Sequence, residues 1–108
     1  MRLGPREDRF EPKALAAVSG ASYVVGSESN RIGLRLEGPA ITWKDAEELP
    51  SEGMVLGAVQ VPPNGQPVVF LRDHPTTGGY PVVGVVLGAD LAVCAQLRPG
   101  DAVTLRVV

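Results

Sequence analysis

Short runs of apolar residues alternate with glycine- and proline-rich segments along the chain. The clearest run is RIGLRLEG at 31–38, in which Ile32, Leu34 and Leu36 occupy every second position. A period of two places these three side chains on one face of a β-strand. Five further runs predict strands, and the valine-rich ones have the pattern of strands buried on both faces: SYVVG (22–26), LGAVQVP (56–62), PVVFL (67–71), PVVGVVL (81–87) and AVTLRVV (102–108).

Two segments have helical character. EPKALAAV at 11–18 carries Pro12 where the first position of a helix accepts proline, followed by Leu15 and Val18 at a spacing of three. ADLAVCAQL at 89–97 begins near Asp90, which could cap the helix, and ends at RPG. We therefore predict a mainly β domain, a barrel or sandwich, with two short helices.

The longest connection is EGPAITWKDAEELPSEG at 37–53, which we expect to cross one end of a barrel. It contains Trp43, Glu47, Glu48 and Glu52. A run of acidic residues is typical of a solvated surface. We expect a wet loop with the tryptophan folded back on the barrel.

Composition narrows the class of protein. A chain of 108 residues is about one domain, and twelve acidic against ten basic residues give a net charge of −2. This balance argues against a nucleic-acid or anionic-membrane surface. The single cysteine, Cys94, excludes an intrachain disulfide and a zinc site of paired thiolates. We expect a cytoplasmic protein with no metal.

Common catalytic motifs are missing from the sequence. His74 is the only histidine and has no partner in a recognisable nucleophile motif, so we interpret it as a turn residue. Cys94 stands among small apolar residues, which is typical of a buried thiol. Neither a P-loop nor the dinucleotide-binding glycine fingerprint is present.

Three polar groups remain as candidates for a site. In SNRIGLR, Asn30 and Arg31 could bind a carboxylate or a planar amide, or could form an Asx turn with a surface arginine. In GAVQVPPNGQP, Gln60 stands among apolar residues and must bond either to a loop backbone or to a ligand.

The third group is TTGGYP. Gly78 and Gly79 could adopt positive φ and expose N–H donors to an oxyanion or a phosphate, with hydroxyl groups of Thr77 and Tyr80 beside them. A two-residue hairpin turn would explain the glycines equally well.

Three longer segments in the same order carry a family resemblance: SNRIGLRLEGP, SEGMVLGAVQVPPNGQPVVFLRDHPTTGGYPVVGVVLGADL and AQLRPGD. They resemble the C-terminal part of the family known as allophanate hydrolase subunit 2, biotin-dependent carboxyltransferase-like protein, KipA-like protein or the C-subunit of 5-oxoprolinase. The resemblance implies a cyclophilin-like β-barrel. It also implies that residues 1–108 form one such domain from a longer family chain.

The resemblance further implies a role in an ATP-dependent 5-oxoprolinase, which opens 5-oxo-L-proline to L-glutamate. Expected partners are a KipI-like subunit (the 5-oxoprolinase B-subunit), a third LamB/YcsF-like subunit and the N-terminal portion of the family chain. We do not expect activity from residues 1–108 alone.

Chemistry suggests roles for the family-like motifs in lactam opening. Thr77, Gly78 and Gly79 could hold an oxyanion or a phosphoryl oxygen. Asn30 and Arg31 could hold the carboxylate of the substrate, and Gln60 could fix the lactam amide. Tyr80 could relay a proton or form a wall of the site, and Glu52 could act as a base that positions water.

Other functions fit the same resemblance. A KipA-like protein could act as a regulatory module that antagonises a histidine-kinase inhibitor. The chain could also belong to an allophanate hydrolase or to the carboxyltransferase part of a urea carboxylase. Prolyl isomerase activity would rest on the cyclophilin-like fold alone.

Overall fold

A computed structural model describes residues 1–45 and 49–108. Nine strands, one short 3-10 helix and two α-helices follow one another in this part of the chain. Their bounds are β1 Arg2–Leu3, η1 Glu7–Arg9, α1 Pro12–Val18, β2 Ser22–Val25, β3 Gly33–Glu37, β4 Glu52–Gly53, β5 Ala58–Gln60, β6 Val68–Phe70, β7 Thr77–Gly78, β8 Val82–Val85, α2 Gly88–Cys94 and β9 Ala102–Thr104.

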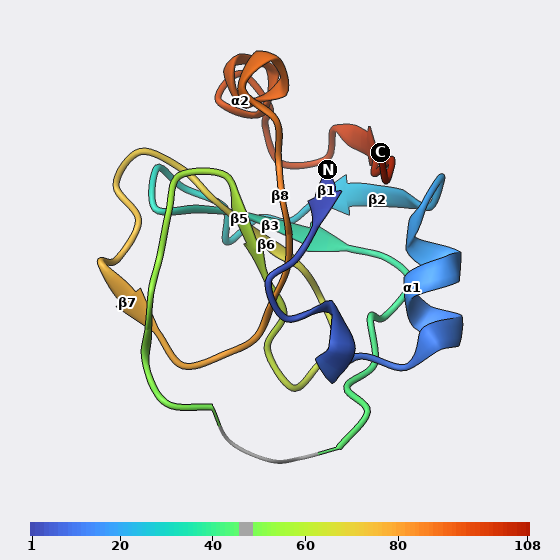
Figure 1. Ribbon diagram of the computed structural model, residues 1–108. Coiled ribbons are helices and arrows are strands. Elements are labelled where there is room, and N and C mark those ends of the chain that lie inside the picture. Colours follow the sequence, from blue (N-terminus) through green and yellow to red (C-terminus); the bar gives the residue numbers. More distant parts are fainter. Residues whose placement is uncertain (46–48) are drawn as a thin grey trace.

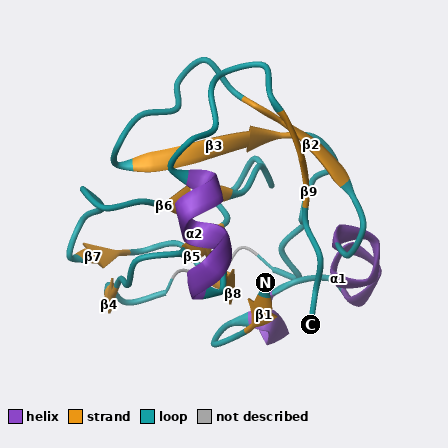
Figure 2. Ribbon diagram, turned by 90° about the horizontal axis from the view of Figure 1, so that it is seen from above, coloured by secondary structure: helices purple, strands orange, loops and turns teal. Residues whose placement is uncertain are grey.

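Seven of the strands form one curled antiparallel sheet in the order β1-β8-β5-β6-β3-β2-β9. The other two, β4 and β7, form a separate two-stranded ribbon at one side of the molecule (Figure 1). The sheet curls into a half-barrel, with α2 over its middle and α1 beside β2 and β9 (Figure 2). The predicted fold class, mainly β with two short helices, is confirmed.

The central strands β5, β6 and β8 are buried on both faces of the sheet. Val59, Val69 and Val83 belong to the main core. The alternate positions of the same strands form a second, smaller apolar cluster together with Met54 from the segment after β4. Its members on the sheet are Ala58, Val68, Phe70 and Val82. This explains why the sequence of these strands is nearly continuous valine rather than alternating.

A β-bulge interrupts the pairing of β5 with β8. Gln60 pairs with Val82, whereas Val59 pairs with Gly84, so Val83 is an extra residue on β8. A bulge of this kind bends its strand and increases the local twist. It lies next to Gln60, the one buried polar residue of the described chain.

The two ends of the described chain lie side by side (Figure 1). The main-chain nitrogen of Met1 donates to the carbonyl of Arg106 over 2.7 Å, and the Val108 nitrogen donates to the Met1 carbonyl over 3.0 Å. The Met1 side chain packs against Gly84, where a Cβ atom would lie 2.6 Å from the Met1 Cγ. These contacts join the region of β1 to the segment that follows β9.

Both predicted helices are present. Pro12 occupies the first turn of α1 as predicted, and Val18 at its end is buried in the core. The prediction that Asp90 caps α2 is wrong, because the helix begins earlier, at Gly88, and Leu87 occupies the N-cap. Asp90 therefore lies within the first turn, where its charge complements the helix dipole.

Ile32 departs from the predicted strand. Leu34 and Leu36 are buried as expected, but Ile32 is 49% exposed and precedes β3. The side chain of Asn30 accepts hydrogen bonds from the main chain here and forms a turn instead of a strand.

None of the helices in the described ranges is long and apolar enough to cross a membrane.

We predict that Gly84→Ala destabilises the fold by about 1–3 kcal/mol, the usual range for overpacking a well-packed core. The added methyl would meet the Arg2 carbonyl oxygen at 2.7 Å, and this backbone atom cannot move aside without disturbing the β1–β8 pairing. Urea unfolding with an unchanged m-value measures the change.

The matched control is Gly88→Ala, whose Cβ has nothing within 4 Å and which lies at the start of α2. This variant should change the free energy of unfolding by no more than ~1 kcal/mol, towards greater stability. Equal urea midpoints of unfolding for Gly84→Ala and Gly88→Ala would contradict the close approach of the Arg2 carbonyl to Gly84.

Candidate functional site

The TTGGYP segment contains the short strand β7 and is not a hairpin turn. In the ribbon, Glu52 pairs with Gly78 and Gly53 pairs with Thr77. The Met54 nitrogen also donates to the carbonyl of Thr76 over 2.9 Å. Glu52 and Gly78, which are far apart in the sequence, therefore lie directly opposite each other on one face of the ribbon.

The glycines of this segment are not required for positive φ, contrary to the sequence-based hypothesis. Neither Gly78 nor Gly79 is among the positive-φ residues of the described chain. Gly78 is needed for space instead, since a Cβ there would lie 2.7 Å from the Gln60 Nε2 and 3.3 Å from the Met54 Sδ. Gly79 has open space around it. The two residues therefore do not form the alternating nest that binds phosphate in other proteins.

Gln60 has the most unusual environment in this region. Its side chain is 8% exposed and lies on the face of the sheet that carries the second apolar cluster. No described residue forms a hydrogen bond with its side-chain amide. Its amide atoms are not among the fully buried unpaired side-chain atoms of the described residues, where Glu7 Oε2 stands alone, so the amide tip is open to water or to a ligand. Polar groups of largely buried side chains are nearly always bonded to protein, water or ligand. Of the two alternatives open from the sequence, a core bridge is not observed.

Arg6 joins this group from the N-terminal segment. Its Nε donates to the Glu52 Oε1 over 2.8 Å, and its Nη2 donates to the same oxygen. The main-chain nitrogen of Arg6 donates to the carbonyl of Val82, which pairs with Gln60. The hydrogen bond and charge of Glu52 raise the pKa of Arg6. The sequence gives no local signal for Arg6, since it is 46 positions from Glu52.

An aromatic pair stands at the same end of β5. The rings of Trp43 and Tyr80 are 6.1 Å apart and tilted by 49°. The Trp43 Nε1 donates to the Val61 carbonyl over 2.9 Å, and the Val61 nitrogen donates to the Pro81 carbonyl over 3.0 Å. Trp43 packs against the main core, which confirms the prediction that it folds back on the barrel. Its neighbour Tyr80 is 44% exposed. Glu47 and Glu48 lie outside the described residues.

Thr77 lies on the other face of the ribbon. Successive side chains of a strand point to opposite sides, and Gly78 faces Gln60. The exposed side chain of Thr77 therefore points away from Gln60. The structure thus brings together Arg6, Glu52, Gln60 and Gly78, with Tyr80 beside them, and we call these five residues the Gln60 group.

Asn30 and Arg31 belong to a different part of the surface. The Asn30 Oδ1 accepts hydrogen bonds from the nitrogens of Ile32 (2.8 Å) and Gly33 (3.3 Å), which is the Asx turn left open as an alternative. The Arg31 Nε lies 3.4 Å from the Asp73 Oδ2, and its side chain is 91% exposed. Both residues line a cavity of about 760 Å³ beside α2, and no residue of the Gln60 group lines it.

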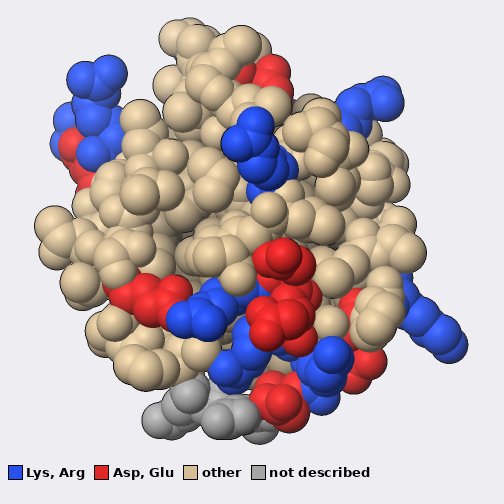
Figure 3. All heavy atoms as spheres, in the orientation of Figure 1, with Lys and Arg blue, Asp and Glu red and all other residues tan. Residues whose placement is uncertain are grey.

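Charge is distributed unevenly over the visible face of the molecule. Acidic and basic side chains interleave over its lower half, whereas the surface around α2 is mostly uncharged (Figure 3). The Arg6–Glu52 pair and the contact between Arg9 and Asp45 (3.8 Å) are two of the ion pairs in the described chain. The described residues contain no group of three potential metal ligands of the His, Cys, Asp or Glu type.

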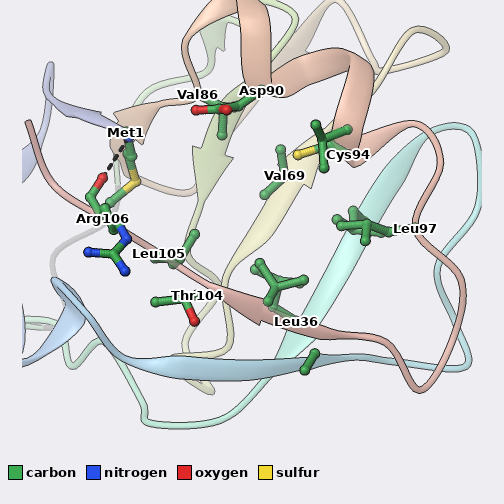
Figure 4. A pocket seen from close by; sticks show the side chains of 14 residues that line it. Met1, Leu36, Val69, Val86, Asp90, Cys94, Leu97, Thr104, Leu105 and Arg106 are labelled. Carbon is green, nitrogen blue, oxygen red and sulfur yellow. Dashed lines mark hydrogen bonds between the residues drawn. The ribbon is translucent and has the colours of Figure 1, made fainter.

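Cys94 and His74, the two other reactive side chains, lie outside the Gln60 group. Cys94 is half-buried and lines a second cavity of about 340 Å³ between α2 and β9 (Figure 4). Burial, and then the charge of Asp90, raise the pKa of its thiol. The ring of His74 stacks on Phe70 with centroids 6.1 Å apart, and its Nδ1 lies 2.6 Å from the Pro75 carbonyl.

The curled sheet with its separate ribbon is shared with a carboxyltransferase-containing protein of known structure, and comparison with known proteins defines the class. The family model for the carboxyltransferase domain, subdomain A and B, matches residues 1–107, and the chain belongs to this family. In the crystal structure of the K. lactis urea amidolyase, a region similar to 95% of this chain superposes with a TM-score of 0.85 at 27% identity. That region is 7% of the amidolyase chain.

Curated relatives point in the same direction. The chain is 39% identical to the 5-oxoprolinase C-subunit of Escherichia coli over 98 residues, or 91% of this chain and 32% of the relative. It is 40% identical to the protein of the same name from Haemophilus influenzae over 86 residues, or 80% of this chain and 28% of the relative. The chain therefore spans about a third of the length of these relatives.

We predict that Cys94 reacts slowly with iodoacetamide, because the thiolate is the nucleophile and both burial and Asp90 favour the thiol. The midpoint of the pH–rate profile should be higher for the folded chain than for the chain unfolded in urea. Asp90→Asn should lower the folded midpoint without removing the whole difference. A folded midpoint equal to or below the unfolded one would contradict this assignment.

Proposed function

We propose that the chain is a component of an ATP-dependent 5-oxoprolinase that hydrolyses 5-oxo-L-proline to L-glutamate, and that the Gln60 group binds the lactam. The observation that carries the proposal is the Gln60 side chain, which is 8% exposed among apolar neighbours and whose accessible amide tip bonds to no described residue. The names of the two bacterial relatives, both 5-oxoprolinase components, support the substrate class.

A lactam matches the hydrogen-bonding pattern of a glutamine side chain. Ring closure holds the lactam N–H and C=O on the same side, so one primary amide can donate to the oxygen and accept from the nitrogen. In this arrangement Nε2 of Gln60 donates to the lactam carbonyl and Oε1 accepts from the lactam N–H. The ligand would replace water at the accessible tip of the Gln60 side chain, to which no described residue bonds.

The surrounding residues suggest how the ring is oriented. Gly78 lies directly over the Gln60 amide, and a Cβ at this position would push Nε2 aside. Tyr80 forms a wall with Trp43 and can relay a proton through its hydroxyl. The Gly79 N–H, beyond the end of β7, is the candidate donor for the oxygen that gains charge as the carbonyl is attacked.

Glu52 and Arg6 have a positioning role in this proposal. Arg6 holds the Glu52 carboxylate at Oε1, and no described residue donates to Oε2. A water molecule on Oε2 would be oriented by a carboxylate that Arg6 fixes in place. Thr77 faces away from this side of the ribbon, so its hydroxyl belongs to a surface open to a partner subunit.

ATP does not fit the described residues of this chain. The sequence has no P-loop, and the Gly78–Gly79 backbone lacks the conformation of a phosphate nest. We therefore assign nucleotide binding to another part of the assembly, which comprises a KipI-like subunit, a LamB/YcsF-like subunit and the N-terminal portion of the family chain. The residues of this chain bind and orient the lactam.

A second candidate is a role in urea carboxylation. The TM-score of 0.85 to the K. lactis urea amidolyase favours it. Urea and cyclic ureido groups also present an N–H and a C=O on the same side, so the Gln60 amide fits them by the same geometry. The two candidates differ in the substrate that stabilises the chain, 5-oxoproline or a urea.

The test is 5-oxoproline-dependent ADP release by the chain alone and in mixture with the proposed partners. We expect turnover only in the full mixture. Gln60→Ala should lower kcat/KM by about 5- to 150-fold, since it removes two hydrogen bonds worth about 0.5–1.5 kcal/mol each. The matched control Gln96→Ala, at an exposed position just after α2, should leave kcat/KM within about twofold.

Full activity of Gln60→Ala in a mixture where wild-type chain is active would overturn the assignment of the lactam site. Silence of the wild-type chain in every mixture, with the proteins folded and associated, would favour the regulatory function. Turnover with urea but not with 5-oxoproline would favour the second candidate.

A further inference from the structure

The larger of the two cavities described above lies apart from the Gln60 group. Its volume is about 760 Å³, which is within the range of small-molecule sites. It is enclosed by α2 on one side and, on the other, by the Asx turn before β3 and the turn after β6. The main-chain nitrogen of Asp73 donates to the Arg31 carbonyl over 3.1 Å, so these two turns are fixed to each other.

The interior of this cavity is apolar. Leucine side chains from four separate segments line it: Leu34, Leu56, Leu71, Leu91 and Leu97. Leu34, Cys94 and Leu97 also line the smaller cavity, so the two cavities share these three apolar residues. No residue of α2 is fully buried, and of the lining leucines Leu34 is 2% exposed whereas Leu56 is 44% exposed.

The rim of the cavity carries a surplus of positive charge. Arg31 and Arg72 lie on it together with a single carboxylate, Asp73. The contact between Arg31 and Asp73 is 3.4 Å long and solvent-exposed, so it is weak and easily exchanged. No described residue forms an ion pair with Arg72. The three groups together leave one net positive charge at the mouth of an apolar cavity.

We propose that this cavity binds an amphipathic monocarboxylate, with its apolar chain against the leucines and its carboxylate on Arg31 and Arg72. A guanidinium group binds a carboxylate through two parallel hydrogen bonds, which makes arginine well suited to this recognition. A net charge of +1 at the rim matches a monoanion better than a dianionic phosphate. This function is independent of lactam binding, because the two sites share no residue.

The test uses the 108-residue chain and decanoate as the probe, with binding measured by isothermal titration calorimetry at low salt. Decanoate should bind at least 10-fold more tightly than decan-1-ol, which has the same chain and no charge. Dodecyl phosphate serves as the dianionic comparison and should bind more weakly than dodecanoate. Equal affinities for decanoate and decan-1-ol would overturn the proposal.

Charge variants locate the carboxylate. The double variant Arg31→Gln/Arg72→Gln should weaken decanoate binding at least 10-fold, whereas Asp73→Asn should tighten it two- to fivefold by releasing Arg31. The matched control Lys13→Gln/Arg35→Gln removes the same charge from positions that do not line the cavity and should change the affinity less than twofold. Equal losses in the two double variants would indicate unspecific attraction and overturn the proposal.

A second pair of variants locates the apolar chain. Leu56 lines the cavity and is 44% exposed, whereas its neighbour Val55 is 56% exposed and does not line it. Leu56→Asp should weaken decanoate binding at least 10-fold and Val55→Asp less than threefold, with unchanged circular dichroism in both. Gln60→Ala should retain decanoate affinity even if it abolishes turnover. Loss of decanoate binding in Gln60→Ala, but not in Leu56→Asp, would indicate that decanoate binds on the β4–β7 side. That result would overturn the proposal.

Discussion

Burial of β5, β6 and β8 on both faces is the constraint on which the rest of the structure depends. One face packs in the main core and the other needs its own cover, because Val68, Phe70 and Val82 would otherwise lie in water. Burying each such side chain is worth about 1.5–3 kcal/mol. The β4–β7 side of the molecule supplies this cover through Met54. The candidate site exists because the second apolar face ends at a polar residue, Gln60.

The strength of this constraint explains which parts of the fold could be predicted from the sequence. Runs such as PVVFL and PVVGVVL are apolar at every position, and strands with both faces buried have this pattern. The strands at β1, β4 and β7 were missed because two residues carry no periodicity. They form through pairing with distant segments, as the register between Glu52 and Gly78 shows.

The site was predictable only in part for the same reason. Gln60 was a candidate because a polar residue among apolar neighbours is visible in the sequence, whereas Gly78 was chosen from the glycine pair of TTGGYP and Glu52 from the chemistry of lactam opening. Arg6 was not visible, since only the pairing of β1 with β8 brings it to Glu52. Asn30 and Arg31 were grouped with the other candidates, but the Asx turn fixes them beside α2 instead.

The role of Gly78 illustrates how one residue type can have two physical explanations. A glycine pair suggests positive φ, yet Gly78 belongs to the strand β7, and a Cβ there would lie 2.7 Å from the Gln60 Nε2, which would have to shift. A substitution at Gly78 would therefore act on the Gln60 amide before it acted on the backbone. The ribbon and the sheet are coupled at this contact, through Met54 on the second apolar cluster and through the Arg6–Glu52 pair. A ligand that bonds to the Gln60 amide would approach it past Gly78, where no side chain stands in the way. The lack of a side chain at Gly78 therefore affects both the packing of the ribbon on the sheet and the access of a ligand to Gln60.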